Sequence, residues 1–380
     1  MGGRRRLLLP ARWKASDAIF WGLCRKPYVN AYWGASAGVD KFHYIDNGDG
    51  TYTYYAINGN KAKQWWDRFV WYNSDNVIDF HVSPNAQIWE TNNNRFNSQS
   101  VEAYDFGGKA IATKSLRETF YLCTKLREVD ISKWTVAGCT DFYATFANCG
   151  DNLKKVALPS DMSMPKCTQA HKAFGWDHNL EEITGMETTD FSAVTTFQEM
   201  FCECHKLSKV SFQVDNWVTN KCTSLYSMFL QCVKLDLGTL GDFKTWDVSS
   251  VTTFHDCFGR TGTTALDLSG WNLAAATDIS QMFNNEAAGL AVKCFESLNL
   301  AGWTLDPAQL TDHSEVFHHC NQLSELNLTG CAAELVAFFK DQLMADIPDR
   351  VKSGLLRLVL DDGTYKYDDA TGGWVAATDE

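Results

Sequence analysis

The sequence predicts an α/β solenoid of about eight repeats, each 25–34 residues long and built from a short helix and a short parallel strand. A mainly β N-terminal domain is expected to precede it. Three observations predict this fold: a Phe that recurs at a nearly fixed spacing, a Thr six residues before that Phe, and a short alternating run after it. The stretch 222–258 contains one full period and the start of the next.

The recurring Phe sets the register of the repeats. Successive Phe residues are separated by 26, 28, 27, 28, 29, 25 and 34 residues. A period of 20–50 residues is typical of a solenoid, in which each unit buries its apolar face against its neighbours. We therefore expect these eight residues in the core: Phe120, Phe146, Phe174, Phe201, Phe229, Phe258, Phe283 and Phe317.

A short helix is expected around each Phe. Apolar residues stand four before, one before, at and three after it, which is one face of a helix of two to three turns. A Thr six residues before the Phe is a suitable N-cap, because its hydroxyl accepts from the free amides of the first turn. The predicted caps are Thr140, Thr168, Thr195, Thr223, Thr252, Thr277 and Thr311.

A short strand is expected after each helix. Runs such as 126–131 (LREVDI) and 207–212 (LSKVSF) place apolar residues first, fourth and sixth, with polar residues between them. Neighbouring units would stack these strands in parallel, with their polar side chains facing outward. This outward face is the predicted binding surface, because its charges are mixed and change from unit to unit. It comprises Arg127, Glu128, Lys154, Lys155, Glu181, Glu182, Lys209 and Glu325.

Several motifs recur in one register, among them Met282–Phe283, Leu266–Asp267–Leu268–Ser269–x–Trp271 and Val251–Thr252. With these motifs, residues 115–330 resemble the BspA-type leucine-rich repeats of bacterial surface proteins. The resemblance implies a leucine-rich-type α/β solenoid that serves adhesion or protein recognition and has no enzymatic activity. The third unit departs from the pattern because it lacks the Trp and the helix Cys, and the seventh carries an insertion around residues 287–292.

The flanks share no period with the repeats, so we expect an aromatic-rich N-terminal anchoring domain (1–105), the solenoid (106–330) and a C-terminal cap (331–380). In the first, residues 41–57 predict a hairpin around an Asn-Gly-Asp-Gly turn. Residues 61–73 fit a short helix or a strand, and the Asn/Ser-rich 91–100 fits a linker. In the cap, we expect a closing helix over 331–344 and a hairpin over 355–369.

Cysteine is the residue that most suggests chemistry, with 13 in the chain. Five stand three after the Phe and three stand seven before it, where Val replaces Cys in two other units. That interchange predicts small, buried free thiols rather than disulfides. The clusters 202–205 (CECH) and 318–320 (HHC) lack the paired spacing of a structural zinc site, so neither a metal nor a cofactor is predicted. Five Trp keep register with core positions, which favours a structural spine over a sugar-binding ladder: Trp134, Trp217, Trp246, Trp271 and Trp303.

Charge and composition exclude several classes of function. The net charge is −12, with an excess of three positive charges in residues 1–110 and of fifteen negative charges after them, which argues against nucleic-acid binding. No run approaches the roughly 18 apolar residues of a membrane span. Leu7–Leu9 is too short for the apolar region of a signal peptide. No phosphate-binding loop, nucleophile elbow or H-E-x-x-H motif is present.

These observations predict a non-enzymatic recognition or adhesion protein that is located on a virion or another extracellular surface. Residues 1–105 would anchor it to other structural proteins of a larger assembly, and a phage virion surface or fibre component fits best. A bacterial cell-surface adhesin of the BspA type is the alternative. A third reading, weighed lower, is an enzyme with its site near His43 and His81. The expected partner is a protein or glycan ligand, and a homo-oligomer could form through the first domain.

Overall fold

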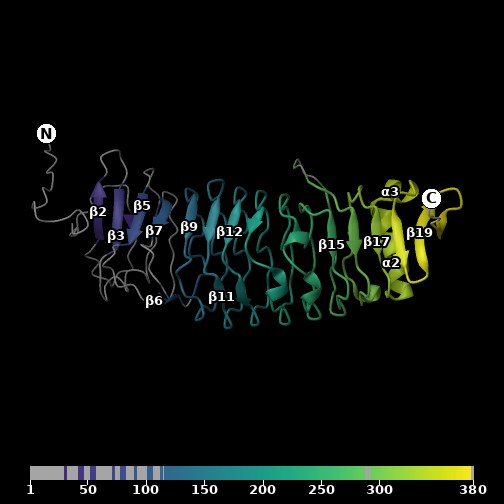
Figure 1. Ribbon diagram of the computed structural model, residues 1–380, viewed down its shortest axis with the longest axis horizontal. Coiled ribbons are helices and arrows are strands. Elements are labelled where there is room, and N and C mark those ends of the chain that lie inside the picture. The colour runs from purple at the N-terminus through teal and green to yellow at the C-terminus, as the bar shows by residue number, and fades with distance from the viewer. Residues whose placement is uncertain are drawn as a thin grey trace, which may run out of the picture.

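In the computed structural model, residues 115–330 form a solenoid whose coils follow one another along the long axis of Figure 1. The structure describes residues 113, 115–286, 290 and 292–377, together with the strands that lie between residues 30 and 113. The predicted repeat solenoid is confirmed. The helix or strand expected over 61–73 and the linker over 91–100 lie mostly outside the described residues. No helix in the described part is long and apolar enough to cross a membrane.

One row of strands runs along the first coils. Its order is β14-β12-β10-β9-β7-β5-β3-β2, and every pair is parallel except β2–β3, which is the predicted hairpin over 41–57. Its strands are β2 (Phe42–Asp46), β3 (Tyr52–Ala56), β5 (Ile78–Val82), β7 (Val101–Asp105), β9 (Glu128–Asp130), β10 (Lys155–Ala157), β12 (Glu182–Thr184) and β14 (Lys209–Val210). Because β7 pairs with β9, backbone pairing continues across residue 105, where the domain boundary stays a prediction.

A second row of strands leads into the C-terminal cap. It consists of β15 (Ala265–Asp267), β16 (Ser297–Asn299), β17 (Glu325–Asn327), β18 (Arg357–Leu360), β19 (Gly363–Asp368) and β20 (Gly373–Ala376). The predicted closing helix is α2 (Ala333–Asp346), followed by α3 (Pro348–Lys352), and the predicted hairpin is β18–β19. Phe339 of α2 packs on the rings of Phe317 and Trp303, so the helix covers the last coil.

The two rows are separated in the fifth coil, where the 3-10 helix η3 (Leu237–Thr239) stands in place of a strand. The Asp236 carboxylate caps it by accepting from the Gly238 amide (3.1 Å). The remaining short elements are β1 (Asn30–Ala31), β4 (Trp71–Tyr72), β6 (Glu90–Thr91), β8 (Ala112–Thr113), β11 (Asp161–Ser163), β13 (Thr188–Asp190), η2 (Val214–Asn216), η4 (Phe243–Thr245) and η5 (Pro307–Gln309).

The short helices predicted around each Phe are wrong. In residues 115–286 and 292–330 this segment is a run of turns, which we call the turn ribbon: the residues from four before to four after each Phe. The residue two before each Phe has positive φ, and so does the residue two after it in every unit but the seventh, as at Ser227 (50°) and Gln231 (61°) around Phe229. A left-handed residue at every fourth position prevents an α-helix. Alternate amides instead donate to the next coil, as Phe229 does to the Cys257 carbonyl (3.0 Å).

The predicted helix caps are also wrong, by one residue. The Thr223 and Thr252 hydroxyls donate to the carbonyl of the equivalent Thr in the preceding coil (both 3.1 Å), which forms a ladder along the solenoid. The residue after the Thr accepts from the second amide of the ribbon, as the Asp278 carboxylate does from Ser280 (3.0 Å). The Thr therefore holds neighbouring coils together and does not cap its own segment.

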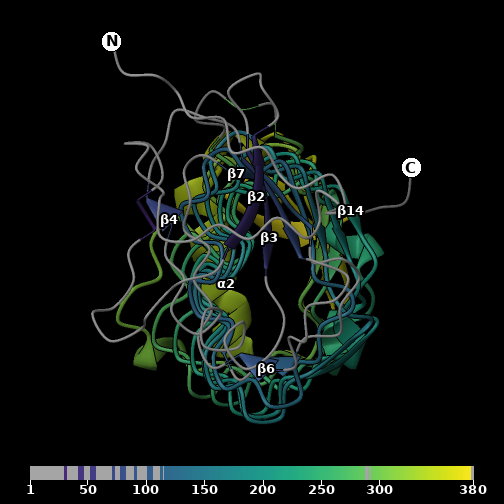
Figure 2. The ribbon, with the colours of Figure 1, turned by 90° about the vertical axis from the view of Figure 1, so that its left-hand side faces the viewer.

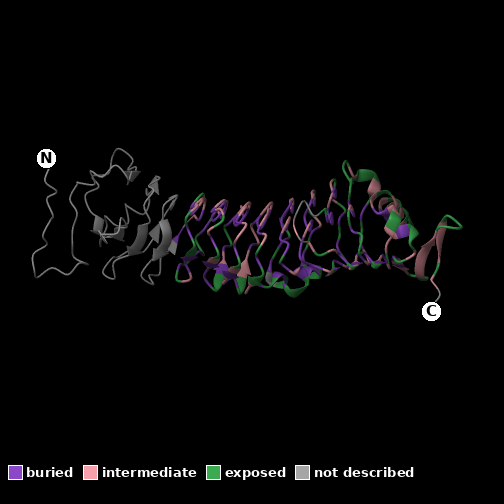
Figure 3. Cartoon of the chain, turned by 90° about the horizontal axis from the view of Figure 1, so that it is seen from above, coloured by how far each residue is buried: buried purple, intermediate pink, exposed green. Residues whose placement is uncertain are grey.

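Buried residues recur in every coil along the described repeats (Figure 3), and the core they form contains a column of stacked aromatic rings. All eight predicted Phe are fully buried, and each ring stacks on the next with centroids 5.3–6.2 Å apart and interplanar angles of 2–11°. The ring column confirms the register of the repeats. The burial of these residues was therefore predicted correctly, although the conformation of their backbone was not.

The five Trp are buried beside this column, as predicted for a structural spine. Trp246, Trp271 and Trp303 donate their indole N–H to carbonyls of a preceding coil at 2.7–2.9 Å. A ring enclosed in this way has no free face for a sugar, so the sugar-ladder reading is excluded for these Trp.

The predicted buried thiols are confirmed for the eight repeat-register cysteines. Cys149, Cys204, Cys232 and Cys320 donate to the carbonyl of the Phe one coil earlier, at 3.1 Å in each case. Cys therefore fills this position as a small apolar side chain that also satisfies a carbonyl. In the third coil the same position holds Asp177. Its carboxyl is fully buried, and one oxygen accepts from the Cys149 amide (2.7 Å) while the other has no partner among the described residues.

Candidate functional site

Seven of the eight residues predicted to bind lie on β9, β10, β12 and β14 or directly before these strands. Figure 1 labels β9 and β12 in this row of strands. Glu325 lies apart, on β17 beside Arg357. The four residues in register alternate in charge: Glu128, Lys155, Glu182 and Lys209. Lys155 pairs with Glu182 (3.2 Å) and Lys154 with Glu181 (3.8 Å), so neighbouring strands compensate each other's charge. This surface is self-neutralising.

The turn ribbon presents a different surface, which the sequence analysis missed. Side chains three residues before each Phe form a row along the coils. The Arg117 guanidinium lies over the Tyr143 ring (4.2 Å), and Tyr143 meets the edge of the His171 ring (5.3 Å). Further along, Tyr226 stacks on His255 with centroids 4.8 Å apart. Each of these four aromatic side chains is partly exposed.

A second group lies beside this row in the third and fourth coils. Glu199 accepts from His171 (2.8 Å) and pairs with Lys172 (3.3 Å), whose ammonium lies over the Trp176 ring (4.6 Å). Burial works to raise the pKa of Glu199, but the His171 hydrogen bond and the Lys172 charge together lower it. The carboxylate is therefore ionised and fully engaged.

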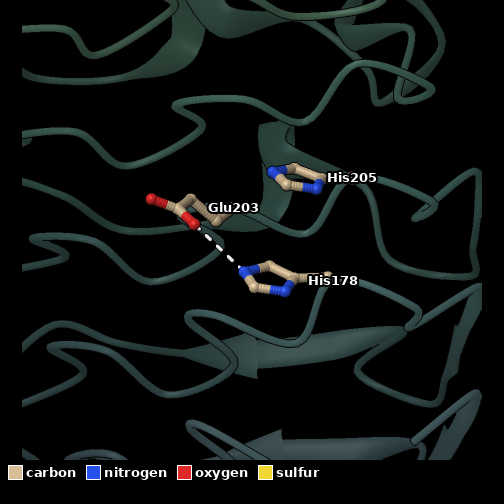
Figure 4. Close-up of side chains that lie close together, drawn as sticks. All are labelled: His178, Glu203 and His205. Carbon is tan, nitrogen blue, oxygen red and sulfur yellow. Dashed lines mark hydrogen bonds and ion pairs between the residues drawn. The ribbon is translucent and has the colours of Figure 1, made fainter. Parts of the chain in front are cut away.

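Two imidazoles and a carboxylate lie together at the other edge of the ribbon (Figure 4). His178 Nε2 lies 3.0 Å from Glu203 Oε2, and the His178 and His205 rings stack with centroids 4.8 Å apart. One ligand atom from each of His178, Glu203 and His205 lies within 4.8 Å of the other two. Burial and the neighbouring His178 lower the pKa of His205, which favours its neutral form.

The repeat region matches a family model whose description is "Mycoplasma protein of unknown function, DUF285". The matched segments are residues 81–180, 168–293 and 197–330, which together span 81–330. The chain belongs to the DUF285 family. No curated protein matches the sequence. At the level of the family, this result agrees with the resemblance to BspA-type repeats.

In the sixth coil of this DUF285 protein, charged side chains of the ribbon form a cluster of ion pairs around the buried Asp256. Asp256 lies 3.7 Å from Arg260 Nη1 and 3.6 Å from His255 Nε2, and Arg260 Nε donates to the Glu286 carbonyl (2.7 Å). Burial raises the pKa of Asp256 although Arg260 and His255 act against it. The cluster joins the ribbons of the sixth and seventh coils, so we assign it a structural role.

The interruption between the two strand rows leaves an open depression of about 410 Å³, lined by Gly238, Asp242, Phe243 and Asp267 among others. Its two carboxylates both pair with Lys244, at 3.6 and 3.5 Å. Both carboxylates in the depression are therefore held in ion pairs, and this arrangement does not resemble a catalytic pair of a free acid and a free base. His43 and His81 are in register with Tyr55 of β3 from either side, and their side chains lie outside the described residues.

The DUF285 repeats contain a signal that could have located the imidazole cluster. His178 and His205 both stand four residues after the Phe of their unit, so the period places them on adjacent coils. The sequence analysis instead judged Cys202, Glu203, Cys204 and His205 as one unit. The structure divides them: both thiols are buried, and only Glu203 and His205 reach the surface.

Proposed function

We propose that this DUF285 protein is a non-enzymatic recognition protein that binds its ligand with the turn-ribbon face. One observation carries the proposal: the ribbon collects partly exposed Arg117, Tyr143, Trp176 and Tyr226 along one side of the solenoid. Arg, Tyr and Trp are enriched at the centres of protein interfaces, whereas Lys and Glu are depleted there. The strand face predicted from the sequence has the second composition, so we move the proposed surface to the ribbon.

The ribbon side chains are held before any ligand arrives. Arg117 is fixed against Tyr143 and Asp141 (3.1 Å), and Lys172 is held between Glu199 and Trp176. A surface whose side chains are already ordered loses less conformational entropy on binding, which supports affinity. A protein or a glycan surface fits this composition, because the ring faces of Tyr and Trp pack on apolar protein groups and on sugars alike.

The test compares two double variants of the full chain in binding to cells and to a glycan array. We expect Tyr143→Ser with Tyr226→Ser to reduce retention of the labelled protein at least tenfold. The strand-face control, Lys155→Ser with Lys209→Ser, should leave retention within twofold. If the strand-face variant loses retention instead, the binding site lies on the strand face. If the unaltered protein is not retained at all, the recognition role is refuted.

We further propose that residues 1–105 attach the solenoid to a larger assembly and that the solenoid is of the BspA surface-protein type. A phage virion and a bacterial cell surface are the two settings. Immunogold labelling with an antibody against the repeats separates them: gold on virions supports the first, gold on cells supports the second, and label confined to the cell interior contradicts both.

A further inference from the structure

We propose that His178, Glu203 and His205 bind one Zn²⁺ ion at the edge of the turn ribbon, on the surface between the third and fourth coils. Imidazole nitrogen and carboxylate oxygen are ligands that Zn²⁺ takes in proteins, and two imidazoles disfavour Ca²⁺ and Mg²⁺. Three protein ligands leave a fourth position open to water or to a group of a bound molecule. In Figure 4, each ring directs one nitrogen to the side on which the Glu203 carboxylate lies.

The geometry requires only small movements. In a tetrahedral site with bonds of about 2.0–2.1 Å, ligand atoms lie roughly 3.4 Å apart. The candidate ligand atoms lie within 4.8 Å of one another, and His178 Nε2 and Glu203 Oε2 are already at 3.0 Å. The side chains of His178 and Glu203 are 40% and 28% exposed, so rotation about their side-chain bonds can close the remaining gap.

Two neighbouring groups orient the imidazoles. Asp151 Oδ1 lies 3.4 Å from His178 Nδ1, on the side of the ring away from Nε2. Gln231 Oε1 lies 3.2 Å from His205 Nε2, and this contact holds the second ring in place. A ligating His almost always donates its other N–H to an oxygen, which fixes the tautomer and the ring orientation, and Asp151 is placed to accept this bond from His178.

The charge at Glu203 distinguishes this cluster from the His171–Glu199 pair on the same ribbon. Glu199 is already neutralised by Lys172 at 3.3 Å. Within the described part of the chain, Glu203 forms its ion pair with His178 alone, so its charge is available to a cation. The adjacent Cys202 and Cys204 do not compete, because both thiols are buried in the core, whereas Glu203 reaches the surface. His171 therefore provides a matched control.

The experiment uses the full chain without a purification tag. Equilibrium dialysis against ZnCl₂ with metal analysis should give one Zn²⁺ per chain. Glu203→Gln and His205→Gln should each weaken Zn²⁺ binding by about tenfold or more, since each removes one of three ligands. His171→Gln should bind Zn²⁺ as the unaltered protein does. With Co²⁺ as a spectroscopic substitute, the absorption should show ligand-field bands without a thiolate charge-transfer band.

Several results would overturn the assignment. They are the absence of Zn²⁺ binding, unchanged affinity in His205→Gln, equal loss in His171→Gln, and a thiolate band in the Co²⁺ spectrum. Circular dichroism and the thermal midpoint of each variant show whether it is folded. If His205→Gln is unstable, the nearly isosteric Glu203→Gln provides the same test. The outcome is independent of the recognition experiment, which depends on Tyr143 and Tyr226.

Discussion

Replacing Asp177 by Cys should stabilise the solenoid. Asp177 occupies the position three after the Phe, where Cys149 and Cys204 stand in the coils on either side. It is fully buried, and one of its carboxylate oxygens has no partner among the described residues. A Cys there can donate its thiol to the Phe146 carbonyl, as Cys204 does to the carbonyl of Phe174.

The magnitude follows from two opposing terms. Removing a buried unsatisfied polar group gains about 1–3 kcal/mol, or more when the group is charged. The change also loses the hydrogen bond from the Cys149 amide to Asp177 (2.7 Å), which contributes about 1 kcal/mol or more. Ionising the buried carboxyl at pH 8 carries a desolvation cost that the Cys does not have. We therefore expect Asp177→Cys to raise the free energy of unfolding by about 1–2 kcal/mol at pH 8.

The pH dependence gives the decisive measurement. Burial raises the pKa of Asp177 well above its ordinary value, so the folded chain holds this proton more tightly than the unfolded chain does. Protonation of Asp177 therefore contributes to the free energy of unfolding. This contribution is fully present at about pH 4 and below, and it is lost as the pH rises through the folded-state pKa. Asp177→Cys removes this loss.

The assay is thermal or urea unfolding of the unaltered protein, Asp177→Cys and an exposed control, Asp130→Asn, at pH 5 and pH 8. We expect the unfolding midpoint of Asp177→Cys to exceed that of the unaltered protein by more at pH 8 than at pH 5. Asp130→Asn should change neither value appreciably. A lower midpoint for Asp177→Cys at pH 8, or an equal difference at both pH values, would refute the reasoning.

Three further substitutions test the coil itself, each by urea unfolding of the full chain. Phe229→Ala should lose about 3–5 kcal/mol because it removes a fully buried ring from the column, and a loss below about 1 kcal/mol would contradict the stack. Leu122 is exposed and has a φ of 60°, so Leu122→Gly should leave the free energy of unfolding unchanged or raise it. If this segment were an α-helix, the same substitution would lower the free energy of unfolding by about 1 kcal/mol. Thr252→Val should lose about 0.5–1.5 kcal/mol by removing a hydrogen bond of 3.1 Å between coils, and no loss would show that the Thr ladder does not hold them together.

The sequence predicted which residues are buried because burial repeats with the period of the chain. Phe229, Cys232 and Trp246 each recur at fixed places in other units, and a solenoid can only place such residues in columns. The parallel strands followed from the alternation in runs such as 153–158, and β10 lies within that run. The hairpin over 41–57 and the cap helix also followed from local patterns.

The helix prediction failed because periodicity alone does not distinguish a helix from another ribbon with the same buried positions. Leu225, Met228, Phe229 and Cys232 fit one face of a helix, and all four are fully buried in a segment that is not helical. The difference lies in hydrogen bonds between coils, such as that from Leu225 to Thr253 (3.1 Å), and these depend on a neighbouring unit. A pattern within one unit cannot show them.

That error in backbone also explains why the sequence analysis did not find the ribbon surface that we propose for binding. In a helix of 3.6 residues per turn, positions four after and two after the Phe lie at widely separated angles, so His178 and Glu203 would not be assigned to one surface. In the turn ribbon, residues at equal or nearby register on successive coils become neighbours, which brings His178 to Glu203 and His205, and His171 to Glu199. The chemistry of this solenoid therefore lies between coils rather than within any single repeat. A substitution on the ribbon should accordingly affect residues about 27 positions away before it affects its neighbours in sequence.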